Sequence, residues 1–301
     1  MKKSLKAFVR GVYELLVSLN ICKAQIVIRV DGGICSQMRQ YLWGCVFKSK
    51  GYKVTFDLTW FEDFGMDMNN RDVRNFDLLK AFPQLEFNEV NGFLLKFYRH
   101  FYNYQGRYPQ SKDLNWINLT PPKLLSGYFA EPEYLYSVFF PKTFKIHTEI
   151  LDEANMQLYQ GIESAVSAAV HVRRGDLAVE LSGYGAPATL IYFKDAIEYL
   201  KKNKGVKFFY MFSDDKEYLI KELIPYVRLH EEEYTIVQNG ADKGYVDMIL
   251  MSKCKHIIAS KGSLGKTAAL LDLKDDRTVI VCNDDNQSFM LNVGNIEKVL
   301  I

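Results

Sequence analysis

Two adjacent arginines at the end of a short apolar run are the residues best suited to bind an anion. Residues 165–172 read as a buried strand, and its last residues open the motif His-Val-Arg-Arg-Gly-Asp, from His171 to Asp176. Gly175 predicts a turn directly after this strand. Guanidinium groups grip phosphate in a bidentate manner, and strand ends in α/β sheets are common ligand sites. The motif therefore indicates either an anion site or a surface turn whose arginines pair with local carboxylates.

Carboxylates and hydroxyls follow the later predicted strands. Asp214 and Asp215 come after the predicted strand 206–212 and fit three roles: ribose binding, support of the arginines, or capping of the next helix. Ser260 and Ser263 stand between a predicted strand and a helix N-terminus, a place where phosphate meets backbone N–H groups. No Asp-x-Asp pair stands at a suitable strand end. The sequence therefore predicts no metal site.

A glycine turn lies near the beginning of the chain. Gly32 and Gly33 follow the predicted strand 25–30 and precede a predicted helix over residues 36–50. A strand, a glycine turn and a helix N-terminus together form a cradle for phosphate or sugar. Two glycines alone equally fit any tight turn between a strand and a helix.

These groups need strands and helices that place them on common edges. The predicted strands of the second half are 165–172, 206–212, 226–229, 234–237, 256–259 and 278–282. Their alternation with helices predicts a parallel sheet, and the strands at 25–30 and 53–57 around a helix predict another. Residues 102–122 read as a loop, and 144–160 as a helix. We expect an α/β protein with two Rossmann-like domains of parallel sheets that face a cleft.

The domain boundaries are set by these patterns. We divide the chain into an N-terminal basic amphipathic helix (1–24), an N-terminal Rossmann-like domain (25–160) and a C-terminal Rossmann-like domain (161–301). In the first segment, apolar residues recur at helical spacing between Lys2, Lys3, Lys6 and Arg10. Such a helix fits an anionic membrane surface or packing on the first domain, and the sequence leaves both open.

Composition excludes several classes of protein. The chain has 301 residues, of which 48% are hydrophobic and 25% charged, as in globular proteins with a large core. The formal net charge of +2 indicates no nucleic-acid partner. The cysteine count is 5, without a Cys-x-x-Cys pair, which favours a reducing cytoplasm over a disulfide framework or a zinc site.

Six segments between residues 26 and 270 share motifs with one family. His-x-Arg-Arg-Gly-Asp is matched in full at 171–176, and Phe-Ser-Asp-Asp at 212–215. The opening Gly-Gly-Leu-Gly-Asn-Gln-Met-Phe-Gln-Tyr is similar to residues 32–41, with Gln37 in place. The remaining similar segments are 127–131, 192–197 and 247–259. The chain thus resembles glycosyltransferase family 11, the bacterial and animal α-1,2-fucosyltransferases.

The resemblance implies inverting transfer of L-fucose from GDP-fucose to the 2-hydroxyl of a galactoside, on a GT-B-like fold, in bacterial O-antigen or surface-glycan synthesis. It implies catalytic roles for three residues. Arg173 stabilises the departing phosphate without a metal or cofactor, His171 hydrogen-bonds in the donor site, and Asp176 is the candidate base. Arg174 is structural or secondary, since neighbours on a strand point to opposite sides. Asp247 is the nucleotide-side carboxylate.

The donor-site residues expected on this basis share positions at strand ends and helix starts. They are Gly32, Gly33, Gln37, His171, Arg173, Arg174, Asp214, Asp247, Ser260 and Ser263. The expected partners are GDP-fucose or a related GDP-6-deoxy sugar and a galactose-terminated glycan or lipid-linked oligosaccharide. The expected location is cytoplasmic, with the amphipathic helix as a candidate peripheral contact on the inner membrane.

One segment departs from the family pattern. After Ile-Ile-Ala the family commonly continues Asn-Ser-Ser-Phe-Ser-Trp-Trp, whereas residues 260–267 read Ser-Lys-Gly-Ser-Leu-Gly-Lys-Thr. The lost tryptophans and added lysines leave the donor open between GDP-fucose and a relative such as GDP-colitose. The same segment lacks only the first glycine of a P-loop, because Ser260 replaces it. A P-loop-like nucleotide hydrolase and a non-catalytic nucleotide-sugar-binding protein are therefore the alternatives.

Overall fold

The computed structural model describes residues 2–66, 73–106, 114–163, 166–177, 186–285 and 287–301. Contacts divide the chain into two units. The first comprises Met1–Asp31, Ser36–Phe64 and Leu85–Pro132, and the second comprises Gly32–Cys35, Gly65–Gln84 and Glu133–Ile301. These contact-defined limits differ from the predicted division near residue 160, because Glu133–Gln160 and the segment Gly65–Gln84 group with the C-terminal part of the chain.

The first unit is built on a four-stranded sheet in the order β2-β1-β4-β3. Its strands are β1 (Gln25–Arg29), β2 (Lys53–Asp57), β3 (Asn103–Gln105) and β4 (Lys123–Ser126), and their pairings are parallel. The central strand β1 is buried over Gln25–Ile28, as an apolar, β-branched strand between two neighbours should be. The prediction of a loop over 102–122 is wrong at β3, which is a three-residue edge strand and too short to show a pattern.

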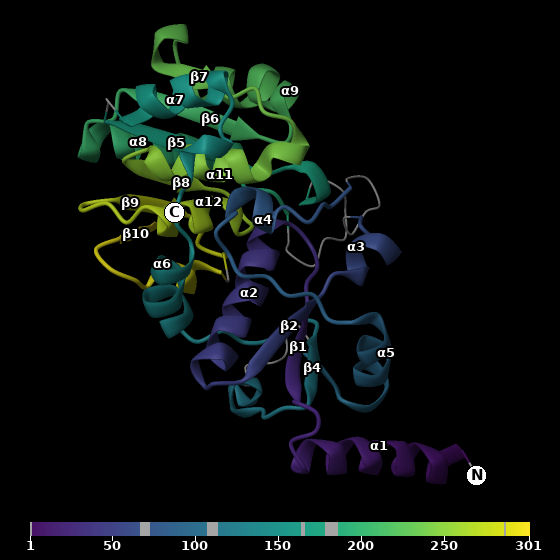
Figure 1. Ribbon diagram of the computed structural model, residues 1–301. Coiled ribbons are helices and arrows are strands. Elements are labelled where there is room, and N and C mark those ends of the chain that lie inside the picture. The colour runs from purple at the N-terminus through teal and green to yellow at the C-terminus, as the bar shows by residue number, and fades with distance from the viewer. Residues whose placement is uncertain (1, 67–72, 107–113, 164–165, 178–185, 286) are drawn as a thin grey trace. The chain divides into compact units, whose positions relative to one another are not determined.

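The helices of the first unit lie around this sheet (Figure 1). They are α1 (Lys2–Ser18), α2 (Ile34–Ser49), α3 (Thr59–Asp63) and α5 (Gly92–Phe101). The side chain of Asn91 caps α5 by accepting a hydrogen bond from the Phe93 N–H. Within the part of the chain that is described, no helix has the length and apolarity to cross a membrane.

The second unit is built on a six-stranded parallel sheet in the order β10-β9-β8-β5-β6-β7. Its strands are β5 (Ser167–Val172), β6 (Phe208–Ser213), β7 (Tyr234–Ile236), β8 (His256–Ala259), β9 (Thr278–Val281) and β10 (Glu297–Leu300). The chain order reverses between β5 and β8, which is the point where doubly wound sheets bind their ligands. Two parallel α/β units are thus confirmed.

The helices of this second unit follow the strands in the predicted alternation. They are α4 (Leu78–Ala81), α6 (Phe140–Thr143), α7 (Glu153–Glu163), α8 (Leu190–Lys204), α9 (Lys216–Tyr218), α10 (Ile224–Val227), α11 (Gly244–Lys253) and α12 (Leu264–Leu271). Thr189 caps α8 by accepting from the Tyr192 N–H, and Gly205 ends it at a φ of +66°. The side chains that α8 buries between these ends join the core of the sheet.

Two predicted elements of this unit are wrong. Residues 226–229 are not a strand, because α10 runs to Val227; Pro225 lies in its first turn, where a missing N–H costs nothing. Residues 144–160 are not one helix, because α7 begins only at Glu153. The edge strand β10 was not expected, since Glu and Lys occupy half of it.

Arg277 fixes the ends of two helices behind the sheet. Its side chain is fully buried, and its five N–H groups have five backbone carbonyl partners. These carbonyls belong to Ser252, Cys254, Lys255, Ala269 and Asp272, at the C-terminal ends of α11 and α12. The Arg277 guanidinium therefore donates hydrogen bonds to backbone carbonyls that a helix end leaves without intrahelical partners.

Candidate functional site

The carboxyl edge of the six-stranded sheet gathers most of the predicted site residues. Because neighbouring strands are parallel, the segments that follow β5, β6, β7, β8 and β9 all leave the sheet at the same edge. His171 lies near the end of the central strand β5, and Arg173 and Arg174 follow that strand. Ser260 follows β8 on one side, and Asp214 follows β6 on the other. The motif with two arginines therefore lies at the switch point of the sheet.

Ser260 ties the β5 and β8 strand ends together. Its backbone N–H donates to the His171 carbonyl at 3.1 Å, and its hydroxyl accepts from the Arg173 N–H at 2.9 Å. The same hydroxyl lies 3.3 Å from Nδ1 of His171. Ser260 is fully buried, so its side chain positions the arginine backbone and the imidazole.

His171 is a buried and neutral imidazole. Burial, with help from the charges of Arg173 and Lys266, lowers the pKa of His171 to about 3. The Ser260 hydroxyl accepts from the Arg173 N–H and lies within hydrogen-bond distance of Nδ1, where the ring tautomer sets which of the two groups donates. With this low pKa, His171 is a hydrogen-bonding group and not a proton-transfer group at neutral pH.

Two glycines let the 260–265 segment approach these residues. Gly262 has a φ of +92°, and a Cβ there would lie 3.2 Å from Cδ of Arg173. A Cβ on Gly265 would lie 3.3 Å from Nδ1 of His171 and 3.0 Å from Cβ of Ala259. The glycines of this segment therefore serve close packing against β5.

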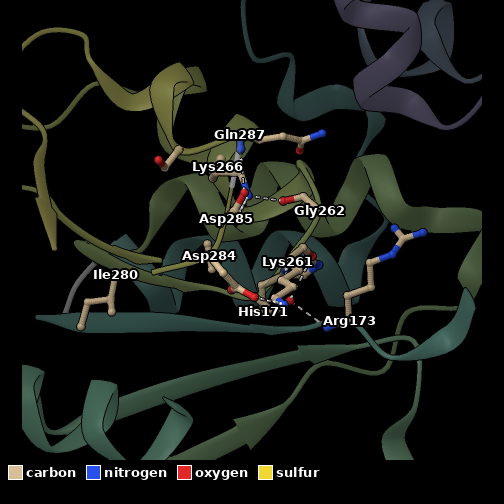
Figure 2. Close-up of polar contacts among 12 residues, drawn as sticks. His171, Arg173, Lys261, Gly262, Lys266, Ile280, Asp284, Asp285 and Gln287 are labelled. Carbon is tan, nitrogen blue, oxygen red and sulfur yellow. Dashed lines mark hydrogen bonds and ion pairs between the residues drawn. The ribbon is translucent and has the colours of Figure 1, made fainter. Parts of the chain in front are cut away.

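The two lysines of the segment each have a carboxylate partner after β9 (Figure 2). Lys261 Nζ lies 2.6 Å from Asp284 Oδ2, whose side chain is largely exposed. Lys266 is fully buried, pairs with Asp285 and donates to the Gly262 carbonyl. Burial lowers the pKa of Lys266, while the Asp285 charge opposes this shift. A P-loop lysine must reach phosphate, so this enclosed ammonium does not fit the P-loop alternative.

Arg174 and the two aspartates after β6 form a second cluster. The Arg174 guanidinium lies over the Tyr218 ring, with its carbon 3.8 Å from the ring centroid, and its Nε lies 3.6 Å from Asp215 Oδ2. Asp215 caps α9 by accepting from the Tyr218 N–H at 2.9 Å. Asp214 accepts from the Arg174 N–H at 2.9 Å, and its Oδ2 would lie 2.7 Å from a Cβ on Gly175. Arg174, Asp214 and Asp215 thus shape the turn that carries Arg173.

Asp247 lies in a separate polar network at the start of α11. Its Oδ1 accepts from Asn239 Nδ2 at 2.7 Å, and Asn239 in turn exchanges hydrogen bonds with Asn155. Lys216 donates to the Asn239 carbonyl at 2.7 Å. Burial raises the pKa of Asp247 to about 6, against the opposing effects of Asn239 and Lys216. Asp247 is therefore held in place and mostly ionised at neutral pH.

The remaining predicted residues lie elsewhere. Gly32, with a φ of +72°, and Gly33 form the turn after β1, and Gln37 is buried in α2. Ser263 is the residue before α12, and its side chain does not cap that helix. The side chain of Asp176 lies outside the described residues. Among the described residues no group of three His, Cys, Asp or Glu side chains has the arrangement of a metal site.

Sequence reasoning missed three residues of this edge: Tyr218, Asn239 and Asp285. Asp285 follows a predicted strand in the same manner as Asp214, so its position after that strand is a signal from which it could have been predicted. Tyr218 and Asn239 carry no local signal, because their roles come from contacts with Arg174 and Asp247.

Comparison with known proteins identifies related chains. The model of a family described as glycosyl transferase family 11 matches residues 88–298. The chain is 24% identical over 296 residues to the Escherichia coli O-antigen biosynthesis glycosyltransferase WbnK, covering 83% of this chain and 91% of that protein. It is 26% identical over 263 residues to an Escherichia coli alpha-1,2-colitosyltransferase, covering 78% and 83%.

Solved structures that are similar to this chain have lower identity. The fucosyltransferase NodZ from Bradyrhizobium has a TM-score of 0.46 and 16% identity, covering 83% of this chain and 93% of that one. The ADP-heptose heptosyltransferase II of Escherichia coli has a TM-score of 0.47 and 10% identity, covering 91% and 90%.

Proposed function

The chain belongs to glycosyl transferase family 11, and from this premise we propose that it moves a 6-deoxy sugar from a GDP donor to the 2-hydroxyl of a galactoside in bacterial O-antigen synthesis. Its membership makes it a glycosyltransferase. The names of the two curated relatives, one an O-antigen enzyme and one a colitosyltransferase, support this biological setting.

Arg173 at the switch point of the sheet is the observation that carries the proposal. Its backbone is fixed by Ser260, and Gly262 leaves room for its stem. When the bond between the sugar C1 and the β-phosphate oxygen breaks, negative charge develops on the departing GDP. Arg173 stabilises that charge, and His171 hydrogen-bonds in the donor site. The acceptor oxygen forms the new bond to C1 from the opposite face, which inverts the configuration.

Two carboxylates complete the proposed chemistry. Asp176 takes the proton of the acceptor hydroxyl in this scheme, and its support is that it is the carboxylate closest to the arginines in the sequence. Asp247 accepts hydrogen bonds from the guanine or the ribose, supported by its fixed position against Asn239. The reaction needs no metal in this scheme, because Arg173 supplies the positive charge.

GDP-fucose and GDP-colitose are the donors to compare. The family's tryptophans are replaced here by a segment with Lys261 and Lys266, but Asp284 and Asp285 pair with both cations. The altered segment therefore adds little net charge to the donor edge, and it changes shape and apolar surface instead. This favours a donor that differs from GDP-fucose in its sugar over a donor that differs in its nucleotide.

The acceptor is proposed to be a galactose-terminated glycan or a lipid-linked oligosaccharide. Gly32, Gly33 and Gln37 remain proposed donor-binding residues. We place the enzyme in the cytoplasm, in contact with the inner membrane. The odd number of cysteines, without a Cys-x-x-Cys pair, supports a reducing compartment.

The test is release of GDP from GDP-fucose and GDP-colitose with β-galactoside acceptors, with and without EDTA. We expect EDTA-resistant turnover that falls at least 100-fold in Arg173→Ala, the scale for loss of one charge-stabilising group. Arg228→Ala, a surface arginine at a helix end, is the matched control and should retain activity. Donor binding without turnover would establish the binding-protein alternative. ATP or GTP hydrolysis that depends on Lys266 would establish the P-loop alternative.

A further inference from the structure

Helix α1 carries a continuous apolar stripe that faces solvent. Phe8, Val12, Leu15 and Leu19 recur at intervals of four, three and four residues, so they lie on one face of the helix and its end. Their side chains are 41% to 68% exposed. Isolated exposed apolar residues are ordinary, but four in one row on a single helix mark an interaction surface.

A different face of α1 attaches it to the first unit. Tyr13 hydrogen-bonds through its hydroxyl to the Tyr98 hydroxyl at 2.8 Å and packs its ring against Phe97, with centroids 4.9 Å apart. Tyr102 donates to Glu14 at 3.3 Å. Because Tyr13 and Glu14 are held by α5 and its end, the apolar stripe is presented outward in a fixed orientation.

The charge of this segment selects one kind of partner. Lys2, Lys3, Lys6, Arg10 and Lys23 oppose the single acidic residue Glu14 between residues 1 and 24. Glu14 is itself paired with Arg10 at 2.8 Å, which leaves the lysines as excess positive charge. An apolar stripe together with excess lysine is the pattern of helices that lie in the interface of anionic bilayers.

We propose that α1 docks this chain on an anionic lipid bilayer, with the four apolar side chains at the acyl boundary and the excess positive charge of the segment attracted to the headgroups. The lipid is preferred over a second copy of the chain because a like-charged helix would repel its equivalent. The inference does not rest on the proposed transfer reaction, since it uses only the surface of α1.

The test is flotation of the full-length protein with vesicles of phosphatidylglycerol and phosphatidylethanolamine, compared with vesicles of phosphatidylcholine. We expect binding to the anionic vesicles that falls at least 10-fold in Phe8→Ser/Leu15→Ser. Lys3→Glu/Lys6→Glu should also weaken binding to the anionic vesicles, since each lysine near the surface contributes roughly five-fold to the affinity. The effect should exceed that of neutral substitutions, because each glutamate also adds a negative charge. Val166→Ser/Ile191→Ser, which removes exposed apolar groups of the second unit, is the matched control and should bind normally.

Three results would overturn the proposal. These are equal binding to neutral and anionic vesicles, normal binding by Phe8→Ser/Leu15→Ser, and a wild-type dimer that becomes a monomer in that variant. Far-ultraviolet circular dichroism and the melting temperature show whether each variant is folded. GDP release with a water-soluble acceptor should be unchanged in the α1 variants, so loss of vesicle binding is distinguished from loss of the transfer reaction.

Discussion

Replacing Lys266 by Met tests whether the buried ion pair holds the 260–266 segment in place. The side chains of Lys266 and Asp285 are 0% and 3% exposed, so Lys266→Met leaves a carboxylate buried without its partner. Removing one member of a buried pair costs about 3–5 kcal/mol of unfolding free energy. For a unit of this size, that corresponds to a fall in melting temperature of roughly 6–20 °C.

A second variant separates two contributions to the loss of stability: the unpaired Asp285 carboxylate and the replacement of the Lys266 side chain. Lys266→Met/Asp285→Asn removes both charges, while the Asn oxygen still accepts from the Gln287 N–H as Asp285 does at 2.9 Å. We expect the double variant to recover at least half of the lost stability. Lys261→Met is the control, because its partner Asp284 is 69% exposed and such pairs contribute about 0–1 kcal/mol.

The assay is urea and thermal unfolding of the three variants, followed by donor KM for those that fold. The reasoning is refuted if Lys266→Met and Lys261→Met lower stability equally, or if the double variant is no more stable than Lys266→Met. In the folded variants we expect a raised donor KM, since Lys266 holds the Gly262 carbonyl and Gly262 lies against the stem of Arg173.

Three further predictions concern single groups. Arg277→Met should lower the unfolding free energy by at least about 3 kcal/mol, because it leaves five carbonyls unpaired; a smaller loss in urea unfolding would contradict this role. The folded pKa of Asp247, about 6, lies above the unfolded value, so the wild-type protein should lose stability as pH rises from 4 to 6. Asp247→Asn should remove this loss and stabilise the protein at pH 7 by roughly 2–3 kcal/mol. The same variant should raise the donor KM. Burial lowers the pKa of His256 to about 4, so the stabilising effect of the neutral ring is present above pH 6.5 and is lost as pH falls toward 4. His256→Gln should therefore make stability less sensitive to acid. A variant whose urea midpoint falls with pH as steeply as that of the wild-type protein would count against this.

Much of the fold is determined by local sequence. The strands at β1, β2, β5, β6, β8 and β9 coincide with short apolar or alternating segments that turn residues bound, and the sequence predicts all six. The position of Arg173 at a strand end follows from the same pattern. The sequence does not predict the edge strands β3 and β10, because none of their residues is buried, whereas the edge strand β2 buries four of its five residues.

Only the tertiary structure decided which groups at the edge are partners. Ser260 is 87 residues from Arg173, and Asp285 is 19 residues from Lys266, so neither contact has a local signal. Asp214 and Asp215 are adjacent, yet one supports the Arg174 backbone and the other caps α9. The sequence determined which residue types stand at the strand ends. The order of the strands decided which of them meet, because that order sets which strand ends are neighbours.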